Sequence, residues 1–342
     1  MTHELTPSSW TGRDDGPGPE RRRWHHAINE SLSPAGSNLP PLAPHGGIAV
    51  IGFQSDEGVR RNRGRVGAAK APAVIRDALA SLSAPAELTA CDLGDITVAD
   101  GAMEAGQQRL GLSVAAALQA GQLPVVLGGG HETAFGSYLG LAGSGTLAGK
   151  HLGIINLDAH FDLRTDPVPS SGTPFRQIAE AELAAGRDFT YRVLGISEAN
   201  NTLELFRTAS ALNVQHMFDE DCCSSGLPAV KEFVHNFLGE VDAVYLTIDL
   251  DVLPAHVAPG VSAPATLGVP LEVILAVCRQ LARSSKLVHV DIVELNPRFD
   301  VDGRTARTAA RLVHAIATEH TAVLPKTPAI PASSPQPGIE FL

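Results

Sequence analysis

Three short polar motifs, each directly following an apolar, strand-like run, constrain the fold of this chain more than any other feature. The motifs are LGGGHE at 127–132, NLDAHFD at 156–162 and TIDLD at 247–251. In open α/β sheets, ligands bind at the carboxyl ends of strands, which is where each motif begins. The fold must therefore bring the ends of three strands to one place.

The motifs supply two histidines and four aspartates, a complete ligand set for two divalent metal ions: His131, Asp158, His160, Asp162, Asp249 and Asp251. Alternate residues of an extended chain point the same way, so the D-x-H-x-D and D-x-D spacings are each expected to aim their side chains at one point. Four carboxylates balance the charge of two divalent cations. A single such pair would indicate only a strand-end cap, but three motifs together favour a metal site.

The kind of ligand indicates the metal and its chemistry. Carboxylate and imidazole without thiolate favour Mn, Mg, Fe or Zn, and this many oxygens favour Mn, so we expect two Mn²⁺ per chain. Two such ions lie roughly 3.5–4 Å apart and share a water, whose bridging hydroxide attacks an electrophilic carbon. Asp162, a ligand beside that water, is the candidate catalytic group that takes its proton and passes it to a leaving amine.

Composition narrows the classes of partner. The chain has 342 residues, 44% of them hydrophobic, and a net charge of −11, which argues against nucleic acid and anionic membranes as partners. Four cysteines without CxxC spacing indicate reduced thiols in a cytoplasmic protein. Residues 1–15 contain no apolar run, so we expect no signal peptide, and no stretch is long enough for a membrane span.

Strand-like and helix-like segments alternate along most of the chain. Strands are expected at 48–53, 123–127, 151–157, 191–195, 243–248 and 287–292, and helices at 72–82, 110–120, 175–185, 271–282 and 305–318. This alternation predicts an α/β fold with a parallel sheet covered on both faces. We expect a single catalytic domain at 46–325, an extended N-terminal segment at 1–45 and a disordered Pro-rich tail at 326–342.

Four segments resemble the ureohydrolase family, which includes arginase, agmatinase and formimidoylglutamase: GGGHE, NLDAHFDLR, TIDLDVLPAHVAPGVSAP and DIVELNP. The resemblance implies an arginase-like, three-layer α/β/α fold with a parallel central sheet of about eight strands. It also implies a binuclear manganese cluster, held by the six residues named above, and hydrolysis of C–N bonds in amidines or guanidines.

Within the family, the chain is most similar to formimidoylglutamase, through SDEGVRRNRGRVGA at 55–68, SSGTPF at 170–175 and the N-terminal WTGRDD and RRWH. This branch converts N-formimino-L-glutamate to L-glutamate and formamide, a step of histidine degradation. Two alternatives stay open: a ureohydrolase acting on another amidine or guanidino substrate, agmatinase- or guanidinobutyrase-like, and a non-catalytic, metal-stabilised regulatory paralogue. The expected partner is a small amidine or amino-acid substrate, and we further expect a homo-oligomer.

The resemblance also implies substrate contacts. Glu294, the second candidate catalytic residue beside Asp162, matches the family carboxylate that binds the cationic amidine, although a strand-end carboxylate can also simply cap a turn. Arg164 and Ser171 fall where arginase contacts the amino-acid end of its substrate, and an arginine there suits a substrate with an extra negative charge. Phe175 falls at the position of arginase's proton-shuttle histidine, so proton transfer would depend on Asp162 and solvent.

A local basic loop stands out on this acidic chain and consists of Arg60, Arg61, Arg63 and Arg65. Such a cluster is either a solvated surface or an anion-attracting rim with one member reaching the substrate. The sequence does not distinguish these two readings.

Overall fold

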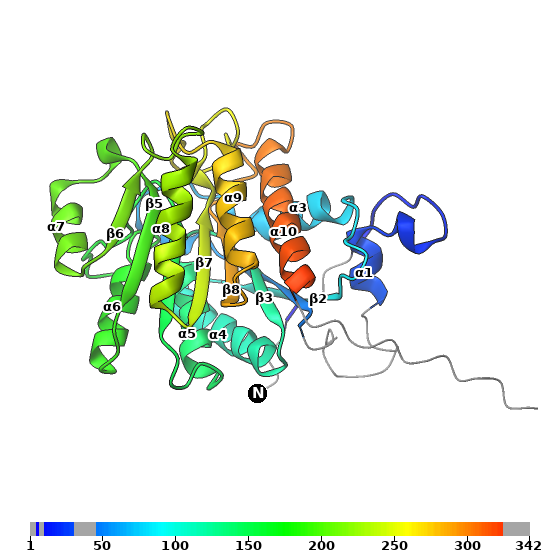
Figure 1. Ribbon diagram of the computed structural model, residues 1–342, viewed down its shortest axis with the longest axis horizontal. Coiled ribbons are helices and arrows are strands. Elements are labelled where there is room, and N and C mark those ends of the chain that lie inside the picture. Colours follow the sequence, from blue (N-terminus) through cyan, green and yellow to red (C-terminus); the bar gives the residue numbers. More distant parts are fainter. Residues whose placement is uncertain (1–4, 7–9, 31–45, 324–342) are drawn as a thin grey trace, which may run out of the picture.

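A computed structural model describes residues 5–6, 10–30 and 46–323, and its centre is one sheet of eight parallel strands (Figure 1). The strands are β1 (Ile48–Gln54), β2 (Ala90–Thr97), β3 (Leu123–Leu127), β4 (Leu152–Leu157), β5 (Thr190–Ile196), β6 (Gln215–Phe218), β7 (Ala243–Asp249) and β8 (Leu287–Val293). Their order across the sheet is β2-β1-β3-β8-β7-β4-β5-β6. The predicted fold class is confirmed.

Helices cover both faces of this sheet and form two separate apolar cores with it. One layer contains α1 (Trp24–Glu30), α3 (Ala71–Ala80), α8 (Leu227–Glu240), α9 (Leu271–Ala282) and α10 (Arg304–Val323). The other contains α4 (Met103–Gln119), α5 (Thr133–Gly143), α6 (Pro174–Ala184) and α7 (Leu203–Ala211). Strands β3 and β7 are buried along their whole length, as a strand covered on both faces must be.

The N-terminal residues differ from the expected extended segment. Residues 24–30 form helix α1, and the side chain of Trp24 is fully buried in the core against α3 and α10. The Trp10 indole donates a hydrogen bond to Asp92 on β2. The hydrophobic pattern of the sequence did not predict that this segment packs on the domain, because its two buried anchors are isolated tryptophans among polar residues. The expected C-terminal tail lies outside the described residues.

The residues that follow β1 also differ from expectation. The basic loop is partly helical: Arg60 and Arg61 lie in the short helix α2 (Glu57–Arg61), and a 3-10 turn follows at Ala68–Lys70. Helix α4 begins at Met103 rather than at Leu110. None of the described helices is long and apolar enough to cross a membrane.

Candidate metal and substrate site

The structure gathers the predicted ligands at the carboxyl ends of three strands. His131 follows β3, Asp158 begins the loop after β4, and Asp249 ends β7. Strand β8 lies between β3 and β7 and brings Glu294 to the same edge of the sheet. The site is therefore built from four neighbouring strands, one of which carries no predicted metal ligand.

The six side chains form two overlapping groups. His131, Asp158, Asp162 and Asp249 make one, and Asp158, His160 and Asp251 make the other. In each group the candidate ligand atoms lie within 4.8 Å of one another. Asp158 belongs to both, so its carboxylate is suited to bridge two ions.

The prediction that each motif aims its side chains at one point is wrong in detail, since Asp249 and Asp251 belong to different groups, and so do Asp162 and His160. In the TIDLD motif the cause is local: after Asp249 the chain turns into a 3-10 helix at Leu250–Val252, so strand alternation no longer applies. The Asp249 carboxylate also accepts a hydrogen bond from the Asp251 amide at 2.8 Å, and Asp158 accepts one from the His160 amide at 2.7 Å. These aspartates therefore cap their own turns as well as facing the cluster.

The distances suit ligands that share an ion. The Nδ1 atom of His131 lies 2.9 Å from Asp162 Oδ2 and 3.2 Å from oxygens of Asp158 and Asp249. The Nδ1 atom of His160 lies 3.1 Å from Asp251 Oδ2. Adjacent ligands of an octahedral ion with bonds near 2.1 Å are about 3.0 Å apart.

Electrostatics also favour cations at this place. Burial opposes charge on His131, but the surrounding aspartates outweigh it and raise its pKa well above the usual value. Burial, and then the charge of Asp251, raises the pKa of Asp249. In other words, the protein alone has more negative charge here than it can hold unprotonated. His131 Nδ1 is buried, yet it lacks a hydrogen bond of good geometry within the described residues. The residues therefore fit a pair of divalent ions.

A second layer of hydrogen bonds orients the ligands. The Nε2 atom of His131 lies 3.0 Å from the Thr247 hydroxyl, and Thr247 in turn hydrogen-bonds buried Asp291. Asp291 also accepts hydrogen bonds from Ser137 and Tyr245. Thr247 and Asp291 begin the TIDLD and DIVELNP segments, but the sequence analysis gave them no role, because only the fold brings them together behind His131.

Two of the residues predicted to be catalytic or to bind substrate have a backbone conformation that L-residues rarely adopt. Asp162 has φ of 50° and Glu294 has φ of 67°. Such strain persists only where the surroundings hold it and is concentrated at functional sites. For Glu294, the amide donates to Gly129 O at 2.8 Å, and carboxylate Oε1 accepts from the His131 amide at 2.8 Å. The carboxylate of Glu294 is thus fixed beside the first metal-ligand loop.

A cavity of about 310 Å³ opens onto the cluster and contains all three predicted substrate residues, Glu294, Arg164 and Ser171. The candidate metal ligands His160, Asp162, Asp249 and Asp251 also line it. Burial, and then the nearby charge of Glu132, raises the pKa of Glu294 to about 8. A carboxylate in that state gains from a cationic neighbour such as an amidinium.

The structure separates the four arginines of the basic loop. Arg60 and Arg61 pair with Glu57, and Arg61 also pairs with Glu104, so both are neutralised away from the cavity. Arg63 and Arg65 line the cavity. Arg65 donates to backbone oxygens of Val261 and Ser262 and stacks over Phe299 at 3.9 Å. Arg63 is left without a side-chain partner among the described residues.

Three polar residues of the cavity were missed by sequence reasoning: Asn62, Asn200 and Ser262. Asn62 donates a hydrogen bond to the predicted substrate residue Ser171 at 3.2 Å. Isolated asparagines in loops give no signal in a single sequence, although Asn62 lies inside the basic loop that was singled out.

Phe175 does not line the cavity. Its ring is fully buried, stacks on Tyr191 and meets the His131 ring edge-on at 5.2 Å. Phe175 therefore packs behind a candidate metal ligand and has no contact with the cavity. No histidine other than His160 lines the described part of this cavity.

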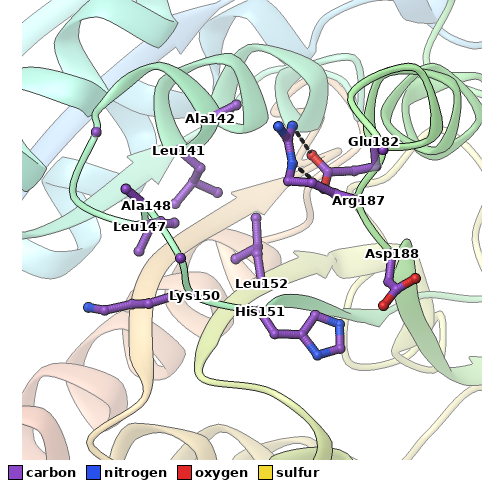
Figure 2. A pocket seen from close by; sticks show the side chains of 13 residues that line it. Leu141, Ala142, Leu147, Ala148, Lys150, His151, Leu152, Glu182, Arg187 and Asp188 are labelled. Atoms are coloured by element: carbon purple, nitrogen blue, oxygen red, sulfur yellow. Dashed lines mark hydrogen bonds and ion pairs between the residues drawn. The ribbon is translucent and has the colours of Figure 1, made fainter.

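A second cavity, of about 580 Å³, lies at the opposite end of β4 (Figure 2). No residue lines both this cavity and the one that opens onto the cluster. Its lining includes Lys150, His151 and the ion pair between Glu182 and Arg187. The larger cavity is therefore not the one that faces the metal-ligand cluster.

Comparison with known proteins matches residues 46–318 to the model of the arginase family. The formimidoylglutamase of Rhodococcus opacus is 55% identical over 321 residues, covering 94% of this chain and 98% of that protein. The crystal structure of Trypanosoma cruzi formiminoglutamase with Mn²⁺ is 26% identical, with a TM-score of 0.71 over 80% of this chain and 93% of that one. Formimidoylglutamase from Bacillus subtilis has the same TM-score at 24% identity, covering 85% and 96% of the two chains.

Proposed function

The chain belongs to the arginase family, and we propose that it hydrolyses the formimino C–N bond of N-formimino-L-glutamate to give L-glutamate and formamide. The observation that carries this proposal is a pair of arginines, Arg63 and Arg164, in the same cavity as the metal ligands and Glu294. Neither guanidinium has a side-chain partner within the described residues. The substrate has two carboxylates and one cationic amidine, and the cavity offers two cations and one carboxylate.

The proposed metal is a pair of Mn²⁺ ions held by His131, Asp158, His160, Asp162, Asp249 and Asp251. Four carboxylates with two imidazoles suit manganese, and the solved relative from Trypanosoma cruzi contains Mn²⁺. When bound, such ions lower the pKa of a water molecule towards neutrality and polarise the substrate.

The protein's own residues then bind, orient and move protons. Glu294 accepts hydrogen bonds from the amidinium and sets the reacting carbon beside the cluster. Asp162 reaches both the cluster and the cavity, so it takes the proton of the attacking water and delivers it to the leaving nitrogen. Arg63, Arg164 and Ser171 hold the two carboxylates of the glutamate end. This reaction would belong to histidine degradation.

A substrate screen tests this proposal against the nearest alternative, hydrolysis of agmatine or guanidinobutyrate. Manganese-loaded protein is incubated with formiminoglutamate, arginine, agmatine and guanidinobutyrate, and formamide, urea and ammonia are measured. We expect formamide from formiminoglutamate and no urea from the other three compounds, because agmatine has no carboxylate and arginine and guanidinobutyrate have only one, whereas the described part of the cavity offers two unpaired arginines. Preferential release of urea would contradict the proposal. The absence of turnover of any of the four by metal-loaded protein would favour the regulatory paralogue. A homo-oligomer and a cytoplasmic location stay predictions.

A further inference from the structure

Glu132, the neighbour of candidate metal ligand His131, is a buried carboxylate that belongs to neither the cluster nor the cavity lining, although its charge helps to raise the pKa of Glu294. Only 1% of its surface is exposed. It stands at the start of α5, and its backbone oxygen accepts a hydrogen bond from Gln107 at 2.8 Å. Burying a carboxylate costs stability unless its contacts compensate, so the contacts of this side chain indicate what it does.

The Glu132 side chain is directed at the residues that start helix α2. Its Oε1 atom accepts hydrogen bonds from the Ser55 hydroxyl at 2.7 Å and from the Gly58 amide at 3.0 Å. The Gly58 amide lies in the first turn of α2, where helical amides lack partners. The carboxylate thus ties α2 to the loop that carries His131.

Glycines on both sides make room for this carboxylate. A Cβ atom at Gly58 would lie 2.4 Å from Glu132 Oε2, and one at Gly130 would lie 2.2 Å from it. The amide of Gly130 also donates to Ser55 O at 3.0 Å, so the two backbones are in direct contact. The contact is therefore a closely packed joint between two loops.

Helix α2 leads directly into the residues that line the cavity. Asn62 follows its last residue and donates to Ser171, and Arg63 comes next, with φ of 61°. Beyond them, Arg65 is held by Val261 and Ser262. The segment that presents Arg63 is thus anchored on one side by Arg65 and on the other by Glu132.

We infer that Glu132 is a positioning residue that holds α2 against the metal-ligand loop and thereby sets Asn62 and Arg63 at a fixed distance from the cluster. It acts on substrate binding rather than on the reacting atoms. This inference rests on the proposed function, because Arg63 matters only if the substrate end that it faces is anionic.

The test uses Glu132→Ala in manganese-loaded, full-length protein. The KM for formiminoglutamate is expected to rise about tenfold while kcat changes less than about threefold, the pattern of lost uniform binding. Inhibition by L-glutamate, which has the same two carboxylates, should weaken by a similar factor. Glu132→Gln keeps an acceptor for Ser55 and Gly58 and should restore KM to within about threefold of the original. Hydrogen exchange at residues 57–63 should accelerate in the alanine variant and less in the glutamine variant.

Glu182→Ala is the matched control, since it removes another buried carboxylate, at the second cavity. It should lower the melting temperature without changing KM. If Glu132→Ala does not fold, Ser55→Ala removes one of the two donors, and its KM should rise about threefold.

Two results would overturn the inference: an unchanged KM with unchanged exchange at 57–63, or a fall in kcat accompanied by metal loss. If the unaltered protein does not hydrolyse formiminoglutamate, the proposed function fails instead. Hydrogen exchange at residues 57–63 then still tests whether Glu132 anchors α2, because that measurement needs no substrate.

Discussion

The Nε2 atom of His131 lies 3.0 Å from the Thr247 hydroxyl oxygen, while Nδ1 of the same ring faces three aspartates. With Nδ1 available for a metal ion, Nε2 carries the proton and donates a hydrogen bond to the Thr247 hydroxyl oxygen. This hydrogen bond fixes both the tautomer and the ring orientation, so it is part of the metal site although it lies outside the ligand set.

Thr247→Val keeps the shape of the side chain and removes this acceptor. We expect manganese affinity to fall about 10- to 100-fold, the usual effect of losing such an outer partner. Titration calorimetry of metal-free protein measures the change. Thr308→Val, in helix α10, is the control, because Thr308 bonds only its own helix. Equal affinities in the Thr247 variant and the unaltered protein would show that the Thr247 hydroxyl is not needed to orient His131.

Metal removal should destabilise the fold. Four clustered aspartates repel one another when no cation is present, and ions that bind only the folded state stabilise it by mass action. Chelation should lower the melting temperature, and manganese should restore it. Elemental analysis of the restored protein should give about two ions per chain, as a two-metal mechanism needs. Asp158→Ala, which affects both groups, should lose at least one ion and nearly all turnover.

Arg63→Ala and Arg164→Ala should each reduce kcat/KM for formiminoglutamate by about 10- to 100-fold, since a charged hydrogen bond contributes roughly 1.5–3 kcal/mol. Metal content should not change. Arg164→Lys should rescue only partly, because lysine lacks the bidentate fork of arginine. Arg60→Ala is the matched control from the same loop, since Arg60 is exposed and paired with Glu57. If the Arg60 variant were impaired as strongly as the other two, general loop damage would explain the effect.

Glu294→Gln should leave the metal content intact and reduce kcat/KM by at least about a hundredfold. The substitution keeps the shape but removes the charge that pairs with the amidinium and places an NH₂ group where an acceptor is needed. Steady-state kinetics with elemental analysis of the same sample measures both quantities. Near-normal turnover would mean that another group binds the amidine.

Buried His289 should make stability depend on pH. Burial lowers its pKa to about 3, whereas the unfolded chain has the ordinary value of about 6.5. Below about pH 6.5 the unfolded state binds a proton that the folded state does not, so this contribution is fully present above that pH and is lost progressively towards pH 3. His289→Leu should therefore show a shallower fall in melting temperature between pH 7 and pH 5. His235→Gln, at an exposed position, should follow the unaltered protein.

The sequence by itself determined the class of fold and predicted which residues gather in the candidate metal cluster. Buried parallel strands must be apolar along their length, and the ligands of such sheets bind after the strand ends. An apolar run such as 123–127 and the polar motif after it can therefore be recognised from the sequence alone. Asp158, His160 and His131 were identified for this reason.

Only the tertiary structure decided which charges are free and which side chains support the site. Arg61 and Arg63 are two positions apart in one basic loop, yet Arg61 pairs with Glu104 while Arg63 enters the cavity. Thr247 and Glu132 act through partners more than 70 residues away along the chain. Pairing and burial depend on which distant segments meet in space, and a single sequence has no local pattern that records those encounters.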